Sequence, residues 1–294
     1  MEGSVGVLRW MITGAGGQVG REYESLFERH ASLIDSAFFT ASDLDVTNRD
    51  AVMAAVESVR PDVIVNAAAM TAVDRCEDEI DRAYAVNALA VRHLVQAASL
   101  FGGQIVHYST DYVFDGESSS PYVEWDVTNP KSVYGRSKNA GERELRRSDL
   151  CIRTAWVVGR FGENMAKTVL RLSKVHETLR FVDDQLGSPT IAEDLVAKSF
   201  ELVMARTSGC FHVTNSGTAT WFEFARAVLE FSGQDPARVL PIPTSALPGE
   251  RRAPRPRNSV LDNMALRLAG FAPMPDWRSS LEALVTYLVK DEAG

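Results

Sequence analysis

The sequence predicts an α/β protein, in which a doubly wound parallel sheet is followed by a smaller C-terminal α/β part. Three observations support this fold class. Short apolar runs alternate with helical patterns through the first half, a glycine-rich loop follows the first apolar run, and the second half is less regular. Strands that alternate with helices at this spacing form βαβ units, which build a mostly parallel sheet.

The elements of the first half follow from apolar runs and from helical periodicity. We expect strands at 7–12, 37–41, 63–68, 104–109 and 150–158, and helices at 18–29, 48–60, 79–101 and 132–147. Pro61 comes directly after the second of these helices, where a stop signal is expected.

The second half predicts a smaller ligand-binding part. We expect helices at 163–176, 192–206, 220–232 and 277–290, strands at 179–182 and 210–214, and a proline-rich loop at 236–256. The chain would then form two domains, residues 1–158 and residues 159–294, with parts of 190–215 as candidates for a return to the first. A ligand would lie between the two domains.

Composition excludes several classes of protein. The net charge of -8 argues against binding to nucleic acid or to an anionic membrane, since both require a positive surface. No apolar run is long enough to span a membrane, and the N-terminus does not have the pattern of a secretory signal. The three cysteines are far apart, and the five histidines lack paired-ligand spacing. We therefore expect a cytoplasmic protein without a disulfide framework or a metal-ligand set.

The glycine-rich loop is the clearest binding motif. Gly14, Gly17 and Gly20 fit the pattern G-x-x-G-x-x-G between the first strand and the first helix, and Gln18 and Val19 open that helix. Glycine lets the backbone approach a pyrophosphate, and the free N–H groups of a helix N-terminus favour negative charge. This context predicts a Rossmann-type dinucleotide-binding domain. A glycine-rich turn without a ligand is the alternative.

The residues after the second strand bear on the choice of cofactor. An acidic residue there would bind the ribose hydroxyls and favour NAD. The chain instead has Thr40, Ala41 and Ser42, and Asp45 with Val46 is expected to flank the adenine. The missing acid favours NADPH, with NADH as the alternative.

Tyr134 and Lys138 are the candidate proton-handling residues. Side chains four residues apart share one face of a helix, and a nearby ammonium lowers the pKa of a phenol. Thr110 ends a central strand, where its hydroxyl can stabilise charge on a carbonyl oxygen. Each residue alone has an ordinary explanation, as a surface pair on a helix or as a local turn bond. A glycine loop, a strand-end hydroxyl and this pair in one chain are more specific.

Together these motifs make the chain similar to the extended short-chain dehydrogenase/reductases and, among them, to the dTDP-4-dehydrorhamnose reductase family. The segments that carry the resemblance are 13–20, 44–47, 60–69, 71–74, 107–114, 134–138 with Gly141 and Glu142, 153–157, 183–190 and 255–262. The ordered set covers nearly the whole chain, although several of these segments would be weak signals of the family on their own.

The resemblance implies a reaction and a role for each domain. NADPH would deliver hydride to C4 of a dTDP-4-keto-6-deoxysugar, with residues 1–158 binding the cofactor and 159–294 mainly the nucleotide sugar. Tyr134 would supply the proton, Lys138 would lower the tyrosine pKa and hold the nicotinamide ribose, and Thr110 would polarise the carbonyl. The resemblance adds Ala67, Ala68 and Thr71 to the cofactor-binding residues.

The resemblance also suggests substrate contacts. Asp111 and Trp156 match positions that border the sugar, although Trp156 is equally explained as a core aromatic. Arg255 and Arg257 are candidates to bind the substrate diphosphate, because guanidinium matches phosphate geometry. The neighbouring Arg251 and Arg252 are equally explained as a solvated basic loop.

Two further observations concern the acid-rich segment and the assembly. Thr71 and Asp74 fit a capping box at the start of a helix.

Some relatives associate through metal-bridged acidic residues, but the sequence locates no such site, so a homodimer and a role for Mg2+ both stay open.

The sequence leaves alternatives for the function. The principal prediction is reduction of dTDP-4-dehydro-L-rhamnose to dTDP-L-rhamnose. The same chemistry on another dTDP-4-keto-6-deoxysugar, in antibiotic or glycan biosynthesis, is a close alternative. A non-catalytic regulatory subunit, as in the methionine adenosyltransferase β subunit of this fold, is a third. The intact set of Thr110, Tyr134 and Lys138 favours an enzyme.

Overall fold

The computed structural model describes residues 7–30, 34–247 and 252–291. The first residues of the chain, on which the predicted absence of a secretory signal partly depends, and Arg251 of the arginine cluster lie outside these ranges.

Six parallel strands form the central sheet: five from the first half, as the sequence predicts, and one from the segment 190–215, which was a candidate for a return to it. They are β1 (Leu8–Thr13), β2 (Ile34–Phe39), β3 (Val63–Asn66), β4 (Gln104–Thr110), β5 (Leu150–Thr154) and β10 (Gly209–His212), in the order β10-β5-β4-β3-β1-β2. The strand order reverses between β1 and β3. Ligands of open α/β sheets bind at such a switch point, beyond the carboxyl ends of the strands.

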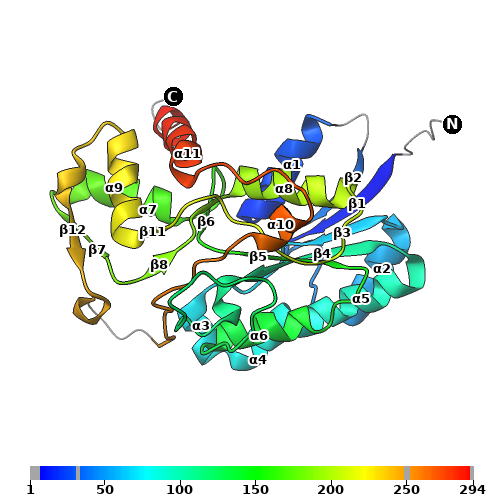
Figure 1. Ribbon diagram of the computed structural model, residues 1–294. Helices are drawn as coiled ribbons and strands as arrows, with labels where there is room; N and C mark the ends of the chain where they lie inside the picture. Colours follow the sequence, from blue (N-terminus) through cyan, green and yellow to red (C-terminus); the bar gives the residue numbers. More distant parts are fainter. Residues whose placement is uncertain (1–6, 31–33, 248–251, 292–294) are drawn as a thin grey trace.

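Helices cover both faces of this sheet. Figure 1 shows α1 (Gln18–Glu28) and α8 (Ala192–Met204) on one face, and α2 (Arg49–Val59), α5 (Ala90–Phe101) and α6 (Val133–Glu142) on the other. Successive side chains of a strand point to opposite faces, so β1 supplies both cores. Trp10 and Ile12 pack with α1 and α8, whereas Met11 packs with α2 and α5.

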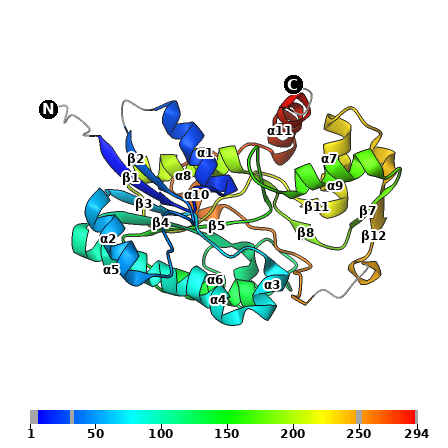
Figure 2. The same cartoon turned by 180° about the vertical axis from the view of Figure 1, so that it is seen from behind.

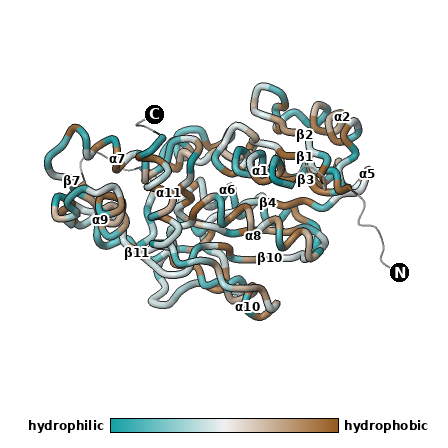
Figure 3. Tube along the Cα trace, turned by 90° about the horizontal axis from the view of Figure 1, so that it is seen from above, coloured by the Kyte–Doolittle hydropathy of each residue, from teal (hydrophilic) through white to brown (hydrophobic). Residues whose placement is uncertain are grey.

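The helices are amphipathic and the strands are largely apolar. Figure 3 shows hydrophobic stretches in the central strands, and helices that alternate between hydrophobic and hydrophilic residues. A parallel sheet covered on both faces requires this pattern, because both faces of each strand are buried.

A second group of elements lies at one end of the molecule (Figures 1 and 2). It contains α7 (Met165–Val175), β7 (Leu179–Val182), β8 (Leu186–Gly187), β11 (Ala219–Thr220), α9 (Trp221–Phe231) and β12 (Val239–Ile242). Its core surrounds the fully buried Phe224, and α11 (Trp277–Asp291) packs against α9. Because α8 and β10 belong to the large sheet layer, the chain crosses between the two groups more than once. The predicted division at residue 158 stays a prediction.

Several predicted elements are shorter or broken. The helix expected at 79–101 consists of α4 (Ile80–Tyr84), a π-helical turn η1 (Ala85–Leu89) and α5, and the helix expected at 132–147 ends at Glu142. The strand expected at 150–158 ends at Thr154, because Trp156 takes a left-handed backbone conformation with φ 47°, and β6 (Val157–Val158) pairs instead with β9 (Thr190–Ile191). Part of the proline-rich loop forms β12, which pairs with β7.

The predicted capping box at Thr71 and Asp74 is wrong. Helix α3 (Val73–Asp78) begins after Ala72, and no side chain caps it. The Asp74 carboxylate instead accepts hydrogen bonds from the Ala253 amide, at 3.1 Å, and from Arg255, at 2.7 Å. A tertiary contact therefore uses the carboxylate that the local pattern assigned to the helix end.

Candidate active site

The glycine loop between β1 and α1 is built by two close backbone contacts. Gly14 has φ 71°, and a Cβ atom there would lie 2.5 Å from the Ala68 amide nitrogen. A Cβ atom on Gly20 would lie 2.5 Å from the Gly14 carbonyl oxygen. Glycine is therefore required at both positions by the packing of the loop itself.

Gly16 faces open space, whereas a Cβ atom on Gly17 would lie 3.3 Å from the Gly14 carbonyl oxygen. A Cβ atom on Gly16 would meet only Thr40, at 3.9 Å, and Gly17 caps α1 without any side-chain hydrogen bond. The first turn of α1 also contains no acidic residue. Its free N–H groups and positive dipole end are therefore available to an anion.

A cavity of about 770 Å³ adjoins this loop. Of the predicted cofactor-binding residues, those that line it are Gly14, Gly17, Asp45, Val46, Ala67, Ala68 and Thr71. Arg75 and Arg82 also line the cavity, and both form ion pairs with Glu79. The bare helix end and the absence of bulky side chains beside the loop fit the diphosphate of a dinucleotide.

The remaining predicted loop residues do not line the cavity. Gln18 donates to the Val157 carbonyl oxygen at 3.4 Å and accepts from Asn164 at 3.1 Å, so it connects the loop to the second group of elements. Val19 packs against the core of the sheet.

Asp45 and Asp43 are both held by nearby hydroxyl groups. Hydrogen bonds from the Thr47 side chain and amide lower the pKa of Asp45, and those from Thr40 lower the pKa of Asp43. Both carboxylates are therefore ionised at neutral pH, and neither occupies the end of β2.

Helix α6 brings Tyr134 beside the end of β4. Ser132 caps the helix by accepting a hydrogen bond from the Gly135 amide, at 3.1 Å. A Cβ atom on Gly135 would lie 2.1 Å from the Tyr112 carbonyl oxygen, so only glycine allows α6 to approach this segment. The half-buried Tyr134 ring then packs edge-on against Tyr112, with 5.6 Å between the ring centroids.

The pKa of Tyr134 lies above its ordinary value, which corrects the expected lowering by Lys138. Burial is the main cause, and Asp111 adds to it by repelling the phenolate, whereas a hydrogen bond with Thr110 acts in the opposite direction. Tyr134 therefore keeps its proton at neutral pH, as a general acid must.

Lys138 is buried one helical turn further along α6. Its Nζ donates to the Tyr108 carbonyl oxygen at 2.5 Å and lies 3.4 Å from His107 Nε2. Burial lowers the pKa of Lys138 to about 8. The lysine is therefore anchored to β4 as well as placed on the same helix as Tyr134.

Thr110 and Asp111 form a hydrogen-bonded pair at the end of β4. Thr110 Oγ1 donates to Asp111 Oδ1 at 2.9 Å and accepts from the Tyr112 amide at 3.2 Å, so the expected turn bond and the strand-end position coexist. Burial raises the pKa of Asp111 to about 6, although hydrogen bonds from Ser259 and Thr110 oppose this shift.

Trp156 lies where the two groups of elements meet. Its ring stacks on Trp221 with 3.5 Å between the ring centroids and 7° between the planes. A Cβ atom on Gly187 would lie 2.4 Å from the Trp156 ring, so glycine makes room for the indole. The side chain is half-buried rather than part of the closed core.

The arginine cluster divides in the structure. Arg252 forms an ion pair with Asp78, and Arg255 with Asp74, so both side chains bind α3. Arg257 is exposed and lines a separate cavity of about 700 Å³ with Lys131 and Asp184.

Sequence reasoning missed a buried polar chain that ends at Lys138. It consists of Thr13, Asn66 and His107, which stand at or near the carboxyl ends of β1, β3 and β4. A polar residue that closes an apolar run such as Val63–Asn66 is a signal that could have located part of it.

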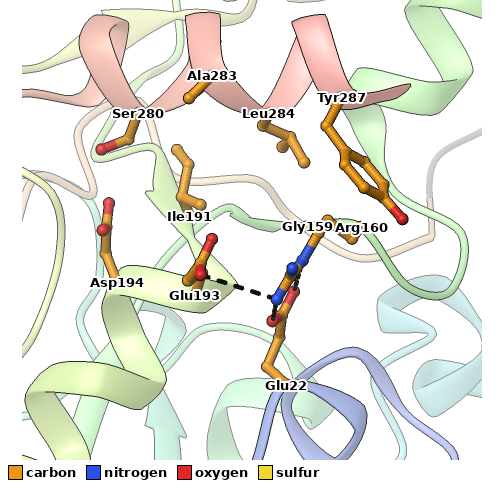
Figure 4. Close-up of a pocket in the computed structure, with 10 residues that line it drawn as sticks. All are labelled: Glu22, Gly159, Arg160, Ile191, Glu193, Asp194, Ser280, Ala283, Leu284 and Tyr287. Atoms are coloured by element: carbon orange, nitrogen blue, oxygen red, sulfur yellow. Dashed lines mark hydrogen bonds and ion pairs between the residues drawn. The ribbon is translucent and has the colours of Figure 1, made fainter. Parts of the chain in front are cut away.

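A third cavity, of about 180 Å³, lies between α1, α8 and α11. Figure 4 shows Arg160 extended between Glu22 and Glu193. Its guanidinium binds Glu22 at 2.5 Å and lies 3.8 Å from Glu193. Within residues 7–30, 34–247 and 252–291, no group of three or more His, Cys, Asp or Glu side chains could hold a metal ion. Arg160 thus pairs with two of the carboxylates of this cavity, and the third, Asp194, accepts from Asn215 at 2.6 Å.

No helix in the described parts of the chain has both the length and the apolar composition of a membrane span.

Comparison with known proteins gives one family. Residues 8–289 match the family model described as the RmlD substrate binding domain. The chain is 41% identical over 282 residues to the dTDP-4-dehydrorhamnose reductase of Streptomyces griseus, covering 93% of this chain and 91% of the relative. It is 39% identical over 289 residues to the dTDP-4-keto-6-deoxy-D-glucose reductase of Streptomyces niveus, covering 97% and 99%.

A solved structure shows the same fold. The dTDP-4-dehydrorhamnose reductase of Bacillus anthracis, in complex with NADP, superimposes with a TM-score of 0.91 at 37% identity. The similarity covers 95% of this chain and 99% of that one.

Proposed function

The chain belongs to the dTDP-4-dehydrorhamnose reductase family, and we propose that it reduces dTDP-4-dehydro-L-rhamnose to dTDP-L-rhamnose with NADPH. It is an NAD(P)H-dependent oxidoreductase. The observation that supports the proposal is the interaction of Thr110, at the end of β4, with Tyr134 of α6, together with the buried Lys138 one turn further along that helix.

The cofactor site is supported by the glycine loop and its cavity. NADPH would supply the hydride that reduces C4 of the sugar. Gly14, Gly17 and the N-terminus of α1 would bind its diphosphate, with Gln18, Val19 and Gly20 shaping the helix start. Asp45 and Val46 would flank the adenine, and Ala67, Ala68 and Thr71 would line the opposite wall. The NADP complex of the Bacillus anthracis relative supports NADPH over NADH.

Tyr134 would protonate the C4 oxygen as negative charge develops on it. Its raised pKa keeps the proton on the phenol until that oxygen becomes basic. Thr110 would hold the oxygen through its hydroxyl, which now donates to Asp111 and would turn toward the substrate.

Lys138 would bind the nicotinamide ribose and stabilise the tyrosinate that forms when Tyr134 gives up its proton. An ammonium close to a new phenolate favours the charged form. Lys138 would therefore act on the tyrosinate that forms during the reaction, because burial dominates the pKa of Tyr134 before the reaction begins.

The dTDP part of the substrate would bind at the surface around segment 255–259. Gly116 packs directly on Pro256, and Ser259 hydrogen-bonds to Asp111, so this segment borders the reacting end of the site. Arg257 is the better candidate for the diphosphate, because the Arg255 charge is already met by Asp74. Asp111 and Trp156 would border the sugar.

Another dTDP-4-keto-6-deoxysugar is the second candidate substrate. The Streptomyces niveus relative carries the name of such a reductase at 39% identity, close to the value for the rhamnose enzyme of Streptomyces griseus. The family likeness therefore supports the reaction more strongly than the identity of the sugar. A non-catalytic regulatory subunit is the remaining alternative.

The test is turnover with defined substrates. Purified protein is mixed with NADPH and dTDP-4-dehydro-L-rhamnose generated in situ, and the loss of NADPH absorbance is followed while the product is identified. We expect dTDP-L-rhamnose. If another dTDP-4-keto sugar reacts faster, that sugar is the substrate instead. If NADPH is not oxidised with any of these sugars, the assignment as an enzyme fails.

The remaining expectations stay predictions. A homodimer, a cytoplasmic location, and the lack of nucleic-acid and membrane partners rest on composition and family likeness. Size-exclusion chromatography with light scattering, with and without Mg2+, tests the first of them.

A further inference from the structure

A buried hydrogen-bond chain joins the catalytic lysine to the strand that precedes the glycine loop. Thr13 Oγ1 lies 3.0 Å from Asn66 Oδ1, Asn66 Nδ2 lies 3.1 Å from His107 Nδ1, and His107 Nε2 lies 3.4 Å from Lys138 Nζ. At most 2% of each residue is exposed. Bulk water therefore does not reach this chain.

We propose that His107 is a positioning residue that holds Lys138 in both of its protonation states, by changing tautomer while Asn66 turns its amide group. This inference rests on the proposed function, because it concerns the lysine assigned to that reaction. The two states of the chain differ by one proton, which the charged state holds on Lys138 Nζ.

The neutral state follows from the observed contacts. An amide Nδ2 only donates, so His107 Nδ1 accepts and the ring proton lies on Nε2. That Nε2–H group faces Lys138 Nζ, and only an uncharged amine has a lone pair to accept it. The amine still donates to the Tyr108 carbonyl oxygen.

The charged state needs the opposite polarity. An ammonium has no lone pair, so His107 Nε2 must accept and Nδ1 must carry the proton. The Asn66 oxygen then accepts from Nδ1, its Nδ2 donates to Thr13, and the Thr13 hydroxyl donates to the Val65 carbonyl oxygen, which lies 3.5 Å away. Every polar group has a partner in each state, so neither state leaves a costly unpaired atom in the core.

The charged groups around Lys138 do not take over the role of His107. The ionisable groups that act on Lys138 are Cys151 of β5, Glu142 of its own helix α6 and His107 of β4. Glu142 is already bound by Arg153 at 2.7 Å and by Ser109 at 2.5 Å. His107 itself is kept neutral, because burial and the Lys138 charge lower its pKa.

The decisive measurement is the tautomer of His107. In histidine labelled with 15N, long-range proton–nitrogen spectra are recorded from about pH 6 to about pH 9.5, a range that brackets the lysine titration. We expect the Nδ1–H form at low pH and the Nε2–H form at high pH, with no imidazolium between them. A His107→Gln variant identifies the signal, and Lys138→Met should abolish the change.

His212 is the matched internal control. It is also fully buried, and its Nδ1 lies 3.1 Å from the Asp262 carbonyl oxygen, which can only accept. We expect the Nδ1–H form of His212 at every pH. A His107 that keeps one tautomer over the whole range, or one that changes identically in the Lys138→Met variant, overturns the proposal.

Kinetics test the consequence for catalysis. His107→Leu removes the partner of Lys138, so we expect kcat to fall about tenfold or more, and its alkaline decline to move to lower pH by about one unit. His107→Gln keeps a group that can donate or accept, and should restore most of the rate and the pH profile. His212→Leu removes a histidine of equal burial and should leave the pH profile unchanged.

The outcomes separate this inference from the proposed function. If the wild-type protein does not oxidise NADPH, the proposed function fails, while the tautomer measurement still decides the role of His107. Normal wild-type turnover with identical pH profiles in His107→Leu and His107→Gln would contradict the positioning role alone. Circular dichroism of each variant checks that the fold persists.

Discussion

Tyr134 is a half-buried phenol whose pKa lies above the ordinary tyrosine value, because burial and Asp111 disfavour the phenolate. A protonated phenol next to Thr110 suits the reduction of a carbonyl, in which the residue donates a proton. Thr110 comes from β4 and Tyr134 from α6. The four-residue spacing of Tyr134 and Lys138 predicted the helix face, but not the contact of Tyr134 with Thr110.

Tyr134→Phe removes the proposed acid and little else. We expect kcat to fall by about 100-fold or more, because general acid catalysis contributes on this scale. The dissociation constant of NADPH should change by less than about threefold, since the ring and its contact with Tyr112 persist. Steady-state kinetics and fluorescence titration measure the two effects, and a normal kcat would remove Tyr134 from this role.

Asp111→Asn tests the buried carboxyl group through stability. The Asp111 pKa is raised from 3.8 to about 6, so the carboxylate is disfavoured in the folded state. Its contribution to stability is therefore fully present below pH 3.8 and is lost as the pH rises through about 6. The asparagine variant cannot ionise and should gain about 3 kcal/mol relative to wild type across this range.

The measurement for this prediction is denaturant unfolding of both proteins from about pH 4 to about pH 8, the interval in which the carboxyl group titrates. Only the difference between the two free energies of unfolding is used, so the other titrating groups cancel. A difference that does not change with pH would contradict the prediction.

At the scale of the element, close backbone contacts decide where the helices sit. Gly135 brings α6 onto the Tyr112 carbonyl, and Gly141 brings it onto Asn87 in the π-helical turn, where a Cβ atom would lie 2.2 Å from the Asn87 carbonyl oxygen. Asn87 in turn donates to Ser137 at 3.0 Å. The break in the expected helix at 79–101 thus supplies the surface that positions the helix with Tyr134 and Lys138.

Gly135→Ala should displace α6. The added methyl group would meet a backbone carbonyl that cannot rotate away, so we expect the free energy of unfolding to fall by about 2 to 3 kcal/mol. The rate should fall too, because Tyr134 moves with the helix. Arg136→Ala, on the exposed face of the same helix, is the control and should change stability by less than about 0.5 kcal/mol. Equal unfolding midpoints for wild type and Gly135→Ala would contradict this account.

At the scale of the whole molecule, the Trp156–Trp221 stack links the two groups of elements. Trp156 follows β5 of the large sheet, and Trp221 begins α9 of the smaller group. The left-handed backbone at Trp156 is unusual for a bulky residue, and such strain persists only where surrounding contacts hold it. The stack therefore fixes a side chain proposed to border the sugar.

Trp221→Leu should weaken sugar binding without affecting the cofactor. An aromatic pair contributes roughly 0.5 to 1.5 kcal/mol beyond its buried area, so we expect KM for the sugar nucleotide to rise up to about tenfold. The NADPH dissociation constant should stay within about twofold, because Trp221 does not line that cavity. Phe222→Leu, the next aromatic of α9, is the control, and an equal rise of KM there would refute a specific role for the stack.

Local patterns determined most of the fold by themselves. The apolar runs, the glycine loop and the helix signals located the strands and helices of the sheet layer within a few residues, because these features depend on nearby sequence, but they did not place β10 beside β5. The sequence also placed Thr110, Tyr134 and Lys138 on the correct strand and helix. The family comparisons confirmed the reductase family that the ordered motifs predicted.

Only the tertiary structure decided the environment of these residues. Burial raises the Tyr134 pKa, and Asp74 binds Arg255 instead of capping a helix. Thr13, Asn66 and His107, from three strands, form a hydrogen-bond chain that ends at Lys138. Desolvation and long-range hydrogen bonds depend on which segments pack together, and residues 41 to 53 positions apart carry no local signal of their contact. The sequence by itself thus determined which residues are candidates for the site, and packing decided their protonation and partners.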